Sequence, residues 1–104
     1  MHAGEQRWRA GYQTLTATQK SVIDVEALKS VRGNIARAKK VLRGHKKGSL
    51  VKTLHGRKKC EVFRDRVENA TDDARLLFSA KLHDAAMETI AKLIRQGRDA
   101  GCRL

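Results

Sequence analysis

Apolar residues at steps of three and four constrain the fold of this chain more than any other feature of its sequence. Over residues 28–42 the repeating apolar positions are Leu28, Val31, Ile35, Ala38 and Leu42. At 100° per residue they fall within an arc of about 80°, which is typical of the packing seam of an amphipathic helix. The chain also contains no proline, the residue that most often breaks helices. We therefore expect an all-α protein.

Capping and turn residues indicate where the first helices begin and end. SVID, residues 21–24, has the form of a capping box, so we expect a long helix to begin at Ser21. Gly44 follows the last apolar position and is expected to end that helix. SLVKTLHG, residues 49–56, predicts a short amphipathic helix with its apolar side chains facing inward and Gly56 as its stop.

The second half of the chain predicts one further helical segment and then a C-terminal helix. Residues 60–70 keep helical apolar spacing, and Thr71 with two aspartates behind it is typical of a new helix N-terminus. The last helix is expected to end at Gly97. We thus predict a small helical bundle made of a long basic helix, a short helix and a C-terminal amphipathic helix. It would form one domain over 18–97, between a flexible arm, 1–17, and a tail, 98–104.

Positive charge is concentrated in the middle of the chain. The net charge is +12, and no Asp or Glu occurs between Glu26 and Glu61, a stretch that holds twelve Lys and Arg residues. The remainder of the chain is therefore neutral. A charge block of this kind indicates a polyanionic partner, either nucleic acid or an anionic membrane surface.

The predicted long helix places much of this charge on one strip. Lys29, Arg32, Lys39, Lys40 and Arg43 fall on the arc beside the apolar seam, with the small residues Gly33 and Ala36 among them, whereas Arg37 points off the strip. From Lys29 to Arg43 the strip would be about 21 Å long, which suits several phosphates of a duplex. The candidate nucleic-acid-binding residues are Lys29, Arg32, Arg37, Lys39, Lys40, Arg43, Lys46 and Lys47.

The sequence lacks the patterns of an active site, a metal site or a cofactor site. Cys60 and Cys102 have no zinc spacing, and we expect two reduced, unpaired thiols in a cytoplasmic protein. His83 lies in the apolar seam of the last helix, where we expect it to be buried and hydrogen-bonded across a helix interface. There is no glycine-rich phosphate loop and no nucleophile motif. We therefore predict that the protein is not an enzyme and binds no metal or cofactor.

NIARAKKVL, followed by SLVKTLHGRKK, resembles the small silencing suppressors of nodaviruses, which bind double-stranded RNA. Those proteins carry a long basic helix with a Lys-Ala-Lys core, followed by a short helix of the type Ser-Val-Val-x-x-Leu-x-Gly-Lys. Arg37, Ala38 and Lys39 stand at that core here, and residues 49–57 at the short helix. The resemblance covers about residues 25–57 and requires a gap in the loop, while the arm and the last helix match nothing in the family.

The resemblance implies a helical homodimer whose paired long helices lie along an A-form duplex and touch phosphates and 2′-hydroxyls without reading sequence. It implies a viral protein of the host cytoplasm that protects RNA from dicing and loading. Arg37, Lys39 and Arg43 match or nearly match the residues that touch the RNA backbone in the family.

Three alternatives stay open at this point. A basic helix with small residues could enter a DNA major groove, although no helix-turn-helix pattern is present. A ribosome-associated or nucleoid-type protein would share the same chemistry on another nucleic acid. An amphipathic protein on an anionic membrane surface would also place a basic arc beside an apolar one, but the seam here is narrow and lacks Trp and Phe.

Overall fold

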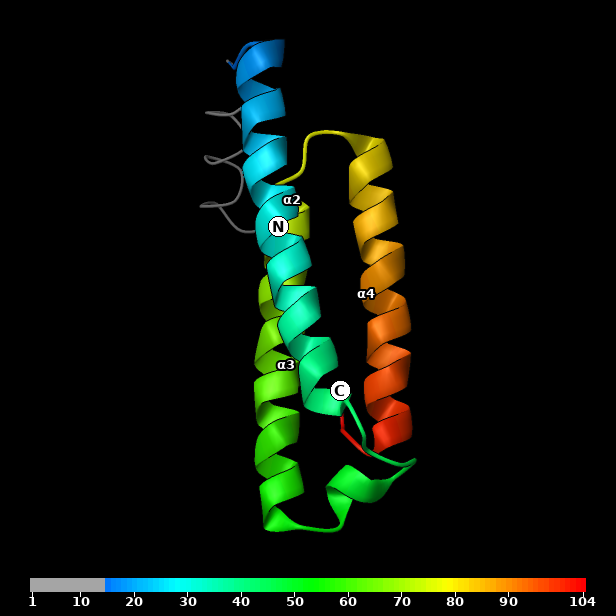
Figure 1. The fold of residues 1–104 in the computed structure, drawn as a ribbon. Helices are drawn as coiled ribbons and strands as arrows, with labels where there is room; N and C mark the ends of the chain where they lie inside the picture. The colour runs from blue at the N-terminus through cyan, green and yellow to red at the C-terminus, as the bar shows by residue number, and fades with distance from the viewer. Residues whose placement is uncertain (1–14) are drawn as a thin grey trace, which may run out of the picture.

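Three α-helices, packed up and down beside one another, make up the fold in the computed structural model, which describes residues 15–104 (Figure 1). The helix α2 (Ala17–Leu42) leads to a short 3₁₀ helix, η1 (Ser49–Val51), at one end of the bundle. The helix α3 (Leu54–Arg75) returns alongside α2, and α4 (Ala80–Ala100) runs back beside the pair. The described residues contain no strand. The prediction of an all-α helical bundle is therefore confirmed.

The predicted seam of α2 forms the centre of the core. Val31, Ile35 and Ala38 are buried, and Leu28 and Leu42 pack against them partly buried. They meet Phe63 and Val67 of α3 together with buried residues of α4. The most extensive helix contact joins α2 and α3, whereas α4 packs less closely on both. The bundle is therefore a tight helix pair to which a third helix is added.

The long helix begins earlier than the sequence pattern suggested. Its N-cap is Thr16, whose hydroxyl accepts a hydrogen bond from the backbone N–H of Gln19 (3.1 Å), while the Gln19 side chain accepts one from the Thr16 N–H. This is a complete capping box one turn before Ser21, so the prediction of a start at Ser21 was wrong. Residues 1–14, most of the predicted arm, lie outside the described residues.

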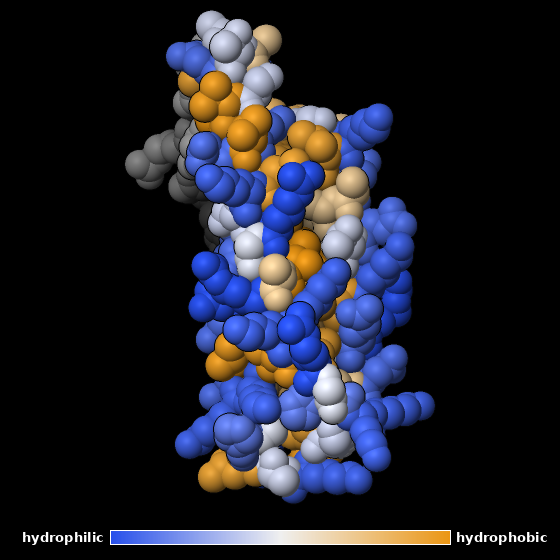
Figure 2. Space-filling model, viewed as in Figure 1, coloured by the Kyte–Doolittle hydropathy of each residue, from blue (hydrophilic) through white to orange (hydrophobic). Residues whose placement is uncertain are grey.

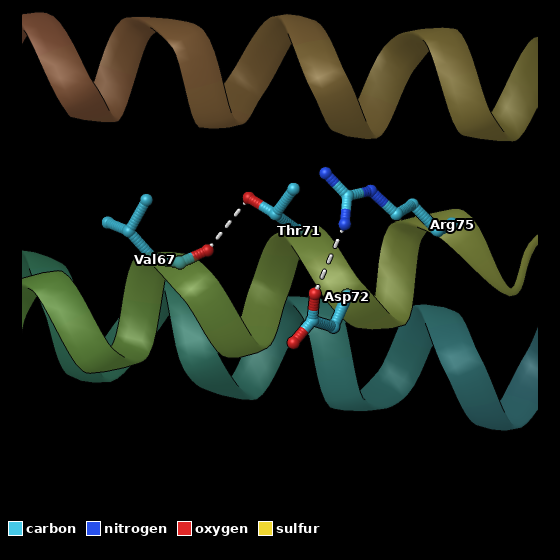
Figure 3. A network of polar contacts seen from close by, with 4 residues as sticks. All are labelled: Val67, Thr71, Asp72 and Arg75. Carbon is cyan, nitrogen blue, oxygen red and sulfur yellow. Dashed lines mark hydrogen bonds and ion pairs between the residues drawn. The ribbon is translucent and has the colours of Figure 1, made fainter. Parts of the chain in front are cut away.

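The helix α3 runs through the position where a break was expected. The Thr71 hydroxyl donates to the carbonyl of Val67, one turn earlier in the same helix, and Asp72 forms an ion pair with Arg75 (Figure 3). Ala70 and Ala74 are both fully buried on either side, so the core face continues without interruption. Thr71 is thus an interior residue, and Ser79 caps α4 instead by accepting from the N–H of Leu82.

The segment predicted as a single short helix is divided between two elements. Leu50 is fully buried in η1, but Val51 and Leu54 are exposed. Gly56 does not end a helix: it lies in the first turn of α3, where its N–H donates to the N-cap residue Thr53 (2.9 Å). Because the hydroxyl of Thr53 accepts this hydrogen bond, Thr53 is the N-cap of α3, and a new helix begins where the sequence predicted the end of one.

The C-terminal residues belong to the fold and are not a tail. Gly97 lies inside α4, where the ring of Phe63 packs so closely that a Cβ would stand 2.6 Å from its Cζ. The helix ends four residues later at Gly101, whose φ of 108° is the left-handed conformation that glycine accommodates. Beyond it, Cys102 is buried. Gly97 thus allows close packing of Phe63, and Gly101 ends the helix.

Cys60 and Cys102 form a disulfide, which overturns the expectation of two reduced, unpaired thiols. Their Cα atoms lie 5.3 Å apart although 42 positions separate them in the chain. Together with Leu50 and Ala100 they make a second, smaller buried cluster that joins η1, α3 and the end of α4. Spacing alone could not reveal the pairing, because it depends on α4 ending beside the first turns of α3.

Candidate nucleic-acid interface

All eight cations chosen from the sequence are exposed, and we call them the basic face: Lys29, Arg32, Arg37, Lys39, Lys40, Arg43, Lys46 and Lys47. The first six lie on α2 or at its C-cap, and the last two lie in the turn before η1. Within residues 15–104 the ion pairs are Arg75–Asp72, Lys92–Glu88 and His83–Asp84, none of which involves the basic face. Its charge is therefore not neutralised within the described fold.

The cations divide between the two sides of α2. Arg32 and Lys39 line a groove on the side of α4, with a volume of about 420 Å³. Arg37, Lys40 and Arg43 line a second pocket on the side of α3, with a volume of about 330 Å³. Arg37, expected to point off the strip, is thus an exposed member of the α3 side. The basic face is wider than a single strip, because it spans α2 from one neighbouring helix to the other.

Small residues lie between the two rows of cations. Ala36 is exposed, and a Cβ added to Gly33 would meet nothing within 4 Å. A phosphate backbone can therefore approach the α2 main chain at this point without meeting a large side chain. The space-filling view shows hydrophilic side chains over much of the face that carries α2, with an apolar strip between α2 and α4 (Figure 2).

The groove between α2 and α4 has an apolar floor. Its lining includes Leu28, Val31 and Ile35 from α2 and Leu82, Ala85 and Ala86 from α4. Ala85 and Ala86 have short side chains that do not fill the gap between α2 and α4, so the groove stays open. The cations of that side therefore stand at the edge of an apolar surface.

The pocket between α2 and α3 contains two residues that the sequence-based selection missed, His45 and Lys59. The ammonium nitrogen of Lys59 donates to Nε2 of His45 over 3.1 Å, since an ammonium group can only donate. Val41 and Val62 complete the lining. The basic sequence RKK at 57–59 was the available signal, but only the return of α3 beside α2 brings Lys59 to the end of the basic face.

The turn that carries the last cations is held by the far end of the chain. The N–H of Gly48 donates to the carbonyl of Asp99 on α4 over 2.7 Å. Gly44 and Gly48 both adopt positive φ angles, of 78° and 72°, on either side of His45, Lys46 and Lys47. The turn is thus fixed by glycine conformation at both ends and by a hydrogen bond to α4.

His83, expected to be buried across an interface, is instead partly exposed. Its side chain is 40% exposed, and its Nδ1 lies 3.3 Å from the carboxylate of its neighbour Asp84. The loose packing of α4 on α2 leaves this position open to solvent. Residues 15–104 contain no group of three or more His, Cys, Asp or Glu side chains able to hold a metal ion.

None of the helices in the described part of the chain combines the length and the apolar character that a membrane span requires. No protein-family model, curated protein or solved structure matches this chain.

Proposed function

We propose that this chain is a non-enzymatic protein that binds double-stranded RNA through its basic face without reading sequence. The observation that carries the proposal is the exposure of all eight cations, with none of them engaged in an ion pair within residues 15–104. Such a surface attracts a polyanion and releases its counterions on binding.

The geometry of the face favours a duplex over a small ligand. The cations from Lys29 to Arg43 extend over about 21 Å of a rigid helix, and small residues between them allow close approach. Double-stranded RNA hides its base edges in a deep major groove, so its binders rely on phosphates, 2′-hydroxyls and shape. A long helix with cations on both sides suits that task.

Single-stranded nucleic acid is a less suitable ligand because it requires aromatic stacking platforms. The chain has only four aromatic residues. Of the two in the described region, Phe63 is fully buried in the core and Phe78 lies under the ammonium group of Lys20, 5.6 Å from its ring centroid. Neither stands on the basic face.

The biological role that we propose follows from the resemblance given above. A protein that covers duplex RNA without reading its sequence would shield that RNA from dicing and loading, as a viral suppressor of RNA silencing does. The same resemblance supports a homodimer, in which both α2 helices would lie along the duplex and contact its phosphates.

The test is a titration of the purified protein against labelled duplex RNA of about two helical turns, at two salt concentrations. We expect Lys39→Ala with Arg43→Ala to weaken duplex binding at least about tenfold, because two phosphate contacts are removed. Lys81→Ala with Arg95→Ala is the matched control, since it removes two exposed cations from α4. Circular dichroism checks that both variants keep their helical content.

Competing ligands distinguish the alternatives. Duplex DNA, single-stranded RNA and vesicles of anionic lipid are titrated in parallel. Tight binding to duplex RNA that weakens steeply with salt is the expected result. Equal binding to every polyanion would favour a general basic protein of the ribosome or nucleoid, and preference for vesicles would favour a membrane surface. Unchanged duplex affinity in the α2 variant would contradict the assignment of the basic face.

A further inference from the structure

We infer that the pocket between the end of α2 and the first turns of α3 is a subsite for a phosphate monoester, the 5′-phosphate at the end of a duplex RNA. This inference rests on the proposed function and goes beyond it, because it assigns one end of the basic face to a particular chemical group. The lining residues are Arg37, Lys40, Val41, Arg43, His45, Lys59 and Val62, around a volume of about 330 Å³.

The charge of this lining is entirely positive. Two arginines and two lysines contribute to it, and it includes no Asp or Glu. The cations come from three places in the fold: the last turns of α2, its C-cap and α3. Four cations gathered around one pocket repel one another, and a bound anion would relieve that repulsion. The pocket is therefore suited to a ligand of high negative charge.

Contacts of the surrounding fold fix the position of the α3 cation. Lys59 is partly buried and donates to His45 across the pocket. The next residue, Cys60, is buried and joined to Cys102, so the backbone beneath Lys59 is tied to the end of α4. A cation held in place loses less freedom when an anion binds than one on a mobile side chain. This separates Lys59 from the exposed neighbouring Lys58.

A terminal phosphate fits this pocket better than an internal one for two reasons. A phosphate monoester carries about −1.5 to −2 charges near neutral pH, as it does in phosphorylated side chains, whereas the bridging phosphodiester carries one. A terminal phosphate is also attached on one side only, so it can enter a pocket that a continuous backbone must pass over. The apolar side chains of Val41 and Val62, the latter 49% exposed, offer a surface for the terminal sugar.

The position of the pocket at one end of α2 agrees with a site for a terminal phosphate. It lies at the C-terminal end of the row of cations that begins at Lys29, so a duplex laid along α2 can end there. The basic-face cations of α2 outside the pocket, Lys29, Arg32 and Lys39, would then contact internal phosphates.

The experiment compares two blunt duplex RNAs of identical sequence, one with 5′-phosphates and one with 5′-hydroxyls. We expect the phosphorylated duplex to bind about tenfold more tightly, the effect of one charge-assisted hydrogen bond. Lys59→Gln should abolish this difference in affinity. Lys58→Gln, an equal change of charge at the preceding residue, should preserve it. Lys40→Gln is a second test variant on an exposed position, which should reduce the difference without affecting folding.

The outcomes separate this inference from the function on which it rests. Equal, tight binding of both duplexes would overturn the subsite and leave duplex binding intact, and so would a preference for phosphate that survives Lys59→Gln and Lys40→Gln. Binding of neither duplex would overturn both. Adenosine 5′-monophosphate is added as a competitor, and removal of the phosphate preference at millimolar concentration would support recognition of the monoester itself.

Discussion

The carboxylate of Asp24 on α2 accepts the backbone N–H of Ser79 over 3.1 Å, although 55 positions separate the two residues. Its other oxygen accepts the N–H of Phe78 over 2.7 Å. These two N–H groups belong to the short connection between α3 and α4, where neither helix can satisfy them. Asp24 is 8% exposed, so the α3–α4 connection is closed by a nearly buried carboxylate from the first helix.

Asp24→Asn should therefore destabilise the fold. An amide has one acceptor oxygen, so one of the two backbone N–H groups would face an NH₂ group and stay unpaired. We expect a loss of about 2 kcal/mol in the free energy of unfolding, measured by urea denaturation with circular dichroism. Glu26→Gln removes the same charge from an exposed site two residues away and should change stability by less than about 0.5 kcal/mol. Equal effects of both substitutions would mean that charge, and not hydrogen bonding, is what matters.

Gly56 and Gly33 both lie in helices but should respond to alanine in opposite directions. A Cβ at position 56 would overlap the carbonyl of Leu50 and stand 3.0 Å from its Cα, so Gly56→Ala must displace buried backbone. We expect it to cost about 1–3 kcal/mol. Gly33→Ala meets no atom within 4 Å and should stabilise α2 by about 0.5–1 kcal/mol, because alanine loses less backbone entropy in a helix.

Thermal unfolding provides the measurement for this pair. In a chain of this size, about 1 kcal/mol corresponds to a shift of about 4–8 °C in Tm. A rise in Tm for Gly56→Ala would show that η1 is free to move away from α3.

The Cys60–Cys102 disulfide should contribute substantially to stability. It closes a loop of 42 positions, and a crosslink over that length lowers the entropy of the unfolded chain enough to stabilise the fold by about 2–4 kcal/mol. We expect a reductant to lower Tm for the natural sequence. The double variant Cys60→Ser with Cys102→Ser should start from the lower Tm and be insensitive to the reductant. Identical Tm values of the natural chain with and without reductant would contradict a stabilising crosslink.

The periodicity of local sequence predicted α2 well, since its seam repeats over several turns and one face packs continuously. The local sequence predicted the ends of the later helices poorly. Thr71 with its two aspartates has the composition of a helix start, yet its neighbours Ala70 and Ala74 are held in the core by α2 and α4. The chain actually leaves the helix at 76–79, which contains no glycine or proline. The backbone N–H groups of this connection are satisfied by the carboxylate of Asp24 on α2, so no local turn residue is needed.

In the candidate site, too, the residues on one helix could be predicted from the sequence, whereas contacts between helices could not. The exposure of the α2 cations follows from the position of the apolar seam, so those residues could be chosen from sequence. Lys59 and His45 could not, because their contact depends on the way α3 returns beside α2. The disulfide was missed for the same reason: two cysteines at distant positions meet only when three helices of particular lengths are in place.

A negative charge placed at the centre of the basic face should block duplex binding without harming the fold. Ala36 is exposed between the two rows of cations, on the surface that the proposed duplex would contact. Ala36→Glu should weaken duplex RNA binding by about tenfold or more, since opposed like charges at an interface cost several kcal/mol. The dependence of affinity on salt should also become shallower, because fewer phosphates are contacted.

Ala91→Glu is the matched control for this last substitution, because Ala91 is an exposed alanine in the middle of α4. It adds the same charge and the same side chain to another helix, and its duplex affinity should stay within about twofold of the unsubstituted chain, as expected for a distant charge that is screened by salt. If both variants lost affinity equally, binding would depend on the net charge of the protein, and the arrangement of cations on α2 would have no special role.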